Sequence, residues 1–66
     1  MEVIVNGECH LLGDDTCVLG LLESLGADPA HVAVERNRAI ILHTEFEQTP
    51  LAHGDVIEVV RFVAGG

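Results

Sequence analysis

Residues 56–66 read VIEVVRFVAGG, and this stretch decides how the rest of the 66-residue chain is interpreted. The β-branched and aromatic residues over 56–62 predict a strand. Gly65 and Gly66 follow it directly. Whether this strand lies at the edge or the centre of a sheet depends on the elements that precede it.

Composition and charge limit the class of protein. An apolar fraction of 48% predicts a packed globule, and 66 residues suffice for one small domain without a deep active site. Eleven acidic residues against three arginines and no lysine give a net charge of −8. Phosphate backbones and anionic membrane surfaces would repel such a chain, so we expect no nucleic-acid and no membrane partner.

The N-terminus and the cysteines bear on the compartment. The chain passes straight from Met1 into a strand-like run, without the basic region, long apolar stretch or cleavage site of a secretory signal. We therefore expect a cytoplasmic protein in which Cys9 and Cys17 remain reduced. Two cysteines are also too few for an iron–sulfur cluster held by Cys alone.

A hairpin is predicted at the N-terminus. Residues 2–6 alternate in a strand-like pattern, Asn6-Gly7 is a strong two-residue turn signal, and residues 8–12 form the returning strand. In the returning strand the period of two separates apolar from polar side chains. We expect the apolar pair to face the core and the polar pair to face away from it: Cys9 and Leu11 inward, Glu8 and His10 outward.

A helix follows this hairpin. Thr16 is a suitable N-cap, and the preceding Asp14 and Asp15 suit the positive end of the helix dipole. Gly26 ends the helix and Pro29 blocks its continuation. One apolar face arises from side chains spaced at i, i+3, i+4 and i+7: Val18, Leu21, Leu22 and Leu25.

The remaining elements complete the fold. Residues 31–35 and 39–42 predict a second hairpin, and residues 43–55 an irregular connection. The order strand, strand, helix, strand, strand, strand predicts an α+β domain of the β-grasp, or ubiquitin-like, type, with one helix on one face of a mixed sheet of four to five strands. In this fold the last strand lies centrally, parallel to the first.

The two faces of the last strand differ in their expected roles. Because Glu58 should avoid the core, Ile57 and Val59 face the helix, and Val60 and Phe62 face the open side of the sheet. Exposed apolar groups of this kind often mark partner surfaces. We expect a partner-binding patch made of these residues, a neighbour on the first strand and the flanking carboxylate: Val60, Phe62, Ile4 and Glu58.

Beyond a domain over residues 1–62, residues 63–66 are expected to be a flexible tail. Val63, Ala64, Gly65 and Gly66 would span ~13 Å at ~3.3 Å per residue, enough to enter another protein's active site. Glycine passes narrow channels because it lacks a Cβ atom. The carboxylate of Gly66 is the group that such a tail delivers. Once it is adenylated with ATP, that carboxylate can accept sulfur and become a nucleophilic thiocarboxylate.

The motifs resemble one family over almost the whole chain. They are VNGE at residues 5–8, VAVERN at 32–37, PLAHGDVIEVV at 50–60 and VAGG at 63–66. Together they look like the ThiS family of sulfur carriers in thiamine biosynthesis. The resemblance implies adenylation of Gly66 by a ThiF-type or E1-like enzyme that uses ATP. It also implies sulfur derived from cysteine, as a cysteine desulfurase supplies it, and delivery to thiazole synthase. The domain itself would bind no cofactor.

Other functions remain open at this point. The small subunit of molybdopterin synthase resembles the chain in fold and Gly-Gly end, although that family is usually longer. A protein modifier, or a β-grasp interaction module with an inert end, are further alternatives. An enzyme is not favoured, because the four histidines show no zinc-ligand spacing and no nucleophile lies in a recognised motif. Cys17, in the first helical turn, is the one thiol whose position could favour its thiolate.

Overall fold

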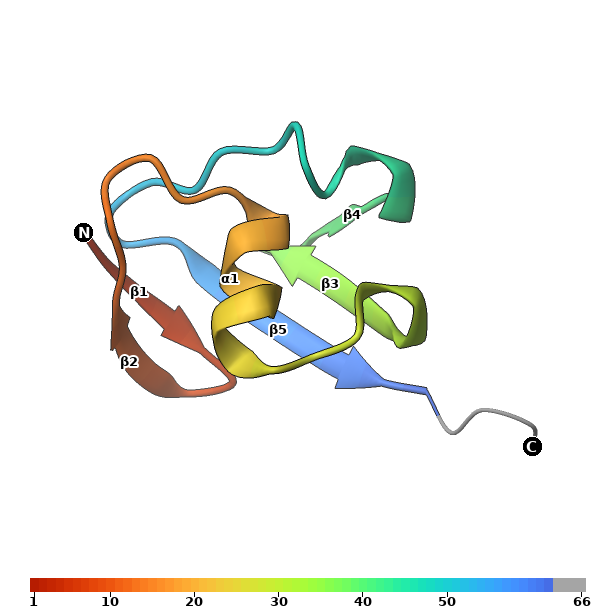
Figure 1. Cartoon of the computed structure of the whole chain (residues 1–66). Helices are drawn as coiled ribbons and strands as arrows, with labels where there is room; N and C mark the ends of the chain where they lie inside the picture. The colour runs from red at the N-terminus through yellow and green to blue at the C-terminus, as the bar shows by residue number, and fades with distance from the viewer. Residues whose placement is uncertain (63–66) are drawn as a thin grey trace.

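The computed structural model describes residues 1–62, which form a five-stranded mixed sheet with one α-helix packed across one face (Figure 1). The strand order is β2-β1-β5-β3-β4, with β5 central, parallel to β1 and antiparallel to β3. The predicted β-grasp arrangement is therefore confirmed. Its elements are β1 (Glu2–Val5), β2 (Glu8–Leu11), α1 (Val18–Leu25), β3 (Val32–Arg36), β4 (Ala39–Ile41) and β5 (Val56–Arg61), with 3-10 turns η1 (Pro29–His31) and η2 (His43–Glu45). The predicted flexible tail, residues 63–66, lies outside the described residues.

Two tight turns with positive φ angles form the hairpins. Between β1 and β2, Asn6 has φ 50° and Gly7 has φ 82°, the primed geometry that matches the twist of the flanking strands. Between β3 and β4, the turn uses Asn37 at φ 51° and Arg38 at φ 71°. Asn tolerates the left-handed region, whereas Arg38 adopts it without the freedom that glycine has.

The predicted orientation of β2 was wrong. Val3 pairs with His10, and Val5 pairs with Glu8. Directly opposite residues share a face of the sheet, and Val3 and Val5 are buried. Glu8 and His10 therefore lie on the helix side, while Cys9 is exposed and Leu11 is 80% exposed on the other. The two-residue turn sets the register, and at this edge strand it prevails over the hydrophobic pattern.

The helix begins one residue later than expected. Its N-cap is Cys17, which makes no side-chain capping hydrogen bond. The Thr16 hydroxyl instead donates to the Gly13 carbonyl oxygen at 2.7 Å, and the Thr16 carbonyl accepts from the Leu51 N–H. Contact with the long connection thus overrides the capping preference of Thr16. At the other end Gly26 caps the helix at φ 70°, as predicted.

The core lies between α1 and the sheet. Val18, Leu21 and Leu22 of α1 pack with apolar side chains on the helix side of β1, β3 and β5. Phe46 and Leu51, from the connection expected to be irregular, are also buried there. Within residues 1–62 no helix has the length and apolar character needed to cross a membrane.

Asp55 is the one buried charged or polar residue of the described chain, and it holds the start of β5. Its Oδ2 accepts from Arg36 Nε at 2.8 Å and from the Ala52 N–H at 2.7 Å. Its Oδ1 accepts from Asn37 Nδ2 at 3.0 Å. Burial raises the pKa of Asp55, but these bonds and the Arg36 charge outweigh that cost and leave the pKa below its ordinary value. Asp55 therefore ties the β3–β4 turn to β5 as a carboxylate.

Replacing Asp55 by Asn is expected to lower the free energy of unfolding by about 2–4 kcal/mol, because the amide presents a donor to groups that are themselves donors. Urea unfolding at pH 7 measures this loss. The matched control is Asp15→Asn at an exposed position, expected to change stability by less than about 0.5 kcal/mol. Equal stability of the two variants would contradict the anchoring role.

The same carboxylate predicts an acid-dependent loss of stability. A pKa below the unfolded value of about 3.9 means that the unfolded chain binds more protons in acid. The contribution of Asp55 is thus complete above that value and disappears as pH falls through its folded pKa. Urea titrations between pH 5 and pH 2 should show the stability gap between the wild type and Asp55→Asn narrowing. A gap that stays constant would rule this account out.

Candidate functional site

The open face of β5 has the predicted alternation. Ile57 is fully buried under α1 and Val59 is half-buried, whereas Val60 is 58% exposed. Phe62, just past the strand, is 55% exposed. Two large apolar side chains therefore meet solvent at the end of the central strand. Their role in binding a partner stays a prediction.

The structure separates Ile4 from Val60. Ile4 pairs with Val56, while Val60 pairs with Ala33. Val60 lies four residues further along β5, about 13 Å away. Ile4 is half-buried and Val56 is exposed, so the apolar surface of the open face has two parts rather than one continuous patch.

Two carboxylates lie between these apolar parts. Glu58, predicted as part of the patch, is exposed and pairs directly with Glu35 across the β3–β5 ladder. Like charges in directly opposite positions destabilise a sheet. Both line a hollow of about 530 Å³ that also includes Arg38 and Val56. Sequence reasoning missed Glu35 and Val56, because only the strand register shows that they adjoin Glu58 and Ile4.

The end of β5 is fixed by a backbone contact at Phe62. Its N–H donates to the His31 carbonyl oxygen at 2.8 Å. His31 is in turn held by Asp28, whose Oδ2 lies 2.9 Å from His31 Nδ1. The hydrogen bond from the Ala30 N–H, followed by that from His31, lowers the pKa of Asp28. The chain is therefore anchored up to Phe62, the last residue before the predicted tail.

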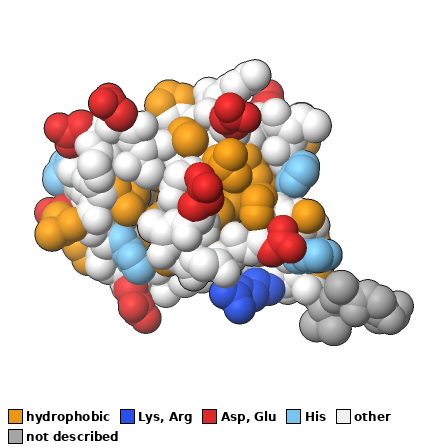
Figure 2. Space-filling model, in the orientation of Figure 1, with side chains coloured by type: hydrophobic (Ala, Val, Ile, Leu, Met, Phe, Trp, Pro, Cys, Tyr) orange, Lys and Arg blue, Asp and Glu red, His pale blue; other side chains and the backbone are white. Residues whose placement is uncertain are grey.

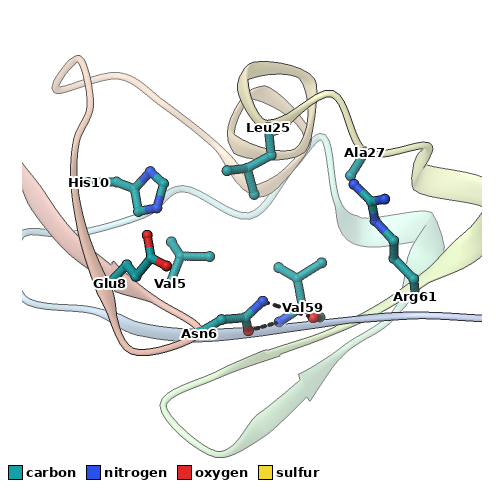
Figure 3. Close-up of a pocket in the computed structure, with 8 residues that line it drawn as sticks. All are labelled: Val5, Asn6, Glu8, His10, Leu25, Ala27, Val59 and Arg61. Carbon is teal, nitrogen blue, oxygen red and sulfur yellow. Dashed lines mark hydrogen bonds between the residues drawn. The ribbon is translucent and has the colours of Figure 1, made fainter.

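A second hollow borders the end of β5 on the helix side (Figure 3). It measures about 360 Å³. In it the Asn6 side chain points at the backbone of Val59 and bonds to both its N–H and its carbonyl oxygen. The side chains around it come from β1 and the turn after it, from β2, from the end of α1 and the segment that follows it, and from β5: Val5, Asn6, Glu8, His10, Leu25, Ala27, Val59 and Arg61.

The surface charge is mainly negative. Figure 2 shows acidic side chains spread around an apolar area on the helix side, with basic side chains at one place along the lower edge. Of the three arginines, Arg36 is engaged with Asp55, whereas Arg61 lies exposed at the end of β5. A partner with a basic surface is thus favoured electrostatically.

The described residues include two free thiols. No group of three metal-ligating side chains occurs within residues 1–62. Cys9 is exposed, and its hydrogen bond to Glu2 raises its pKa, which disfavours the thiolate. Cys17, the thiol singled out from the sequence, is half-buried at the helix N-cap.

Comparison with known proteins decides the family. The ThiS family model matches residues 3–66. This chain belongs to the ThiS family. The sulfur carrier protein ThiS of Thermus thermophilus is 39% identical over 64 residues, covering 97% of this chain and 98% of that protein. The crystal structure of thiamine biosynthesis protein ThiS from Geobacter metallireducens covers 100% of both chains, with a TM-score of 0.84 and 30% identity. The resemblance to the ThiS family that the sequence indicates is therefore confirmed.

A further relative is much longer than this chain. The thiazole synthase of Magnetococcus marinus is 42% identical over 66 residues, which is 100% of this chain but 20% of that protein. The ThiS-like chain thus spans a fifth of the length of this relative. A segment similar to this chain therefore forms part of a protein named thiazole synthase.

Proposed function

We propose that Gly66 of this ThiS-family sulfur carrier is the residue on which sulfur is carried. The proposal is supported by the ThiS match, which extends through residue 66, and by the structure of β5. This strand is central and pairs with β3 as far as Arg61, and the next residue, Phe62, bonds to His31 just before β3. The sequence Val63-Ala64-Gly65-Gly66 follows immediately, so a rigid domain carries the reactive end as a handle.

The proposed chemistry has three steps. In the first, a carboxylate oxygen of Gly66 attacks the α-phosphorus of ATP and pyrophosphate leaves, which gives an acyl-adenylate. In the second, a sulfur nucleophile derived from cysteine attacks the activated carbonyl and AMP leaves with the bonding electrons. The sulfur nucleophile is the terminal sulfur of a persulfide on the donor, so the product is an acyl disulfide. In the third step a second thiol attacks the donor's own sulfur, the S–S bond of the acyl disulfide breaks, a disulfide forms between that thiol and the donor, and the thiocarboxylate leaves. The adenylating enzyme binds the ATP and supplies the catalysis, and the carrier supplies the carboxylate.

Thiazole synthase is the proposed acceptor of the sulfur. Support comes from the relative in which a ThiS-like segment and thiazole synthase share one chain, since such an arrangement raises the effective concentration of one for the other. A ThiF-type or E1-like adenylating enzyme and a cysteine desulfurase are the other proposed partners. The cytoplasmic location expected from the sequence stays a prediction.

The adenylating enzyme is proposed to dock on the end of β5. Val60 and Phe62 supply apolar contact area next to the residues that precede Gly66. Glu58 and Glu35 add negative charge on the same face, which favours a basic groove in the partner. The destabilising juxtaposition of these two carboxylates would be relieved once a cationic side chain lies between them.

The sulfur-carrying step is tested by intact-protein mass spectrometry. Incubation with the adenylating enzyme, ATP and a sulfur source should increase the mass of the chain by the difference between one sulfur and one oxygen. A chain lacking Gly66 is the control and should stay unmodified. An unchanged wild type with active partners would refute the carrier step, whereas the same increase in the truncated chain would place the site elsewhere.

The docking surface is tested by Phe62→Asp. A charged group at this apolar position should weaken binding to the adenylating enzyme by about tenfold or more, since a buried unpaired charge destabilises an interface. Isothermal calorimetry gives the affinity, and thermal unfolding confirms the fold. Leu42→Asp is the matched control, because Leu42 is similarly exposed, at 60%, but lies beyond β4. Equal affinities of both variants would remove Phe62 from the interface.

A further inference from the structure

Asn6 binds the last part of β5 through its side chain. Asn6 Oδ1 accepts from the Val59 N–H at 2.8 Å, and Asn6 Nδ2 donates to the Val59 carbonyl oxygen at 3.1 Å. The turn signal identified in the sequence explains the left-handed backbone of Asn6 but not these two bonds. They involve the backbone of β5 close to the point where the described chain ends.

These bonds continue the parallel ladder of β1 and β5. The Ile4 N–H donates to the Asp55 carbonyl oxygen and the Asn6 N–H donates to the Ile57 carbonyl oxygen, both at 2.9 Å. In a parallel ladder the next bond joins the Val59 N–H to the main-chain carbonyl of Asn6. The chain turns at Asn6, however, and the side-chain amide takes the place of the missing main-chain groups.

The Asn37 side chain also replaces a main-chain hydrogen-bonding group, at the opposite end of β5. Its N–H donates to the Val56 carbonyl oxygen at 2.8 Å, and the Val56 N–H donates to Asn37 Oδ1 at 2.9 Å. A paired antiparallel position exchanges two main-chain bonds, and here the side-chain oxygen supplies one of them. In both hairpin turns an Asn side chain thus hydrogen-bonds to the backbone of β5, Asn37 at its start and Asn6 near its end.

Only the Asn6 contact lies next to the segment that leads to Gly66. Main-chain groups of Val59 face β1, whereas the Phe62 N–H bonds to His31 on the β3 side. On the β1 side, Asn6 makes the last hydrogen bonds to β5 found within residues 1–62. Without them the end of the strand would be held from one side alone.

We propose that Asn6 is a positioning residue for the adenylation of Gly66, acting through the end of β5. This inference rests on the proposed function. In-line attack on ATP requires the carboxylate to reach a defined point in the partner, and a strand end held from both sides restricts the orientations from which the last four residues start. Asn6 itself touches neither ATP nor the reacting carboxylate in this role.

The test compares Asn6→Gly with Asn37→Gly. Glycine retains the positive φ angle at either turn and removes the side-chain bonds. Pyrophosphate exchange with the adenylating enzyme, at varied carrier concentration, should show kcat reduced about fivefold to tenfold for Asn6→Gly, with KM within about twofold. Asn37→Gly should leave kcat unchanged. Amide exchange should quicken at Val59 in the first variant and at Val56 in the second, reporting each lost bond directly.

Asn6→Asp should restore part of the kcat that Asn6→Gly loses. Asp tolerates the left-handed region and still accepts from the Val59 N–H, but it has no donor for the Val59 carbonyl oxygen, so its kcat should be intermediate. It also serves as the test variant if Asn6→Gly does not fold.

Three results would overturn the proposal. Adenylation of the wild type with an unchanged kcat in folded Asn6 variants would refute the positioning role alone. If kcat falls equally for Asn37→Gly and Asn6→Gly, both residues only stabilise the sheet and Asn6 has no specific positioning role. A wild type that is not adenylated at all would refute the proposed function, and the positioning role with it.

Discussion

The structure depends on the hydrogen bonds that hold β5 between β1 and β3. The flanking strands run in opposite directions, and both turn away before β5 is fully paired. Asn6 and Asn37 replace the missing main-chain groups, and Asp55 ties the start of β5 to the β3–β4 turn. β5 is therefore hydrogen-bonded to residues on both sides of it. The backbone is held as far as Phe62, the last residue that the structure describes.

The two faces of β5 have different surroundings. Ile57 contributes to the core, while Val60 on the opposite face remains available to a partner. In the proposed function the reactive group is converted in the active sites of other proteins, so the domain needs no enclosed cavity of its own. The small core and the acidic surface are compatible with that proposal. ThiS membership and the shared chain with thiazole synthase in a relative agree with it.

Much of the fold was predictable because local signals agreed with each other. The Asn6-Gly7 turn, the apolar helix face and the Gly26 cap all appear where the sequence places them. The two predictions that were wrong, the orientation of β2 and the N-cap at Thr16, have a common cause. Alternation in β2 shows that Cys9 and Leu11 share a face, but it does not say which face, and the register set by the turn reversed it. At Thr16 a contact with the distant Leu51 prevailed over local capping preference.

The sequence by itself determined the element order, the central place of the last strand, the family resemblance and the exposure of Val60 and Phe62. Only the tertiary structure decided that Glu35 joins Glu58, that Ile4 lies apart from Val60, and that Asn6 binds Val59. The physical reason is the range of the interactions. Periodicity and turn propensity act over a few residues, whereas strand register and side-chain pairing join residues as far apart as 6 and 59.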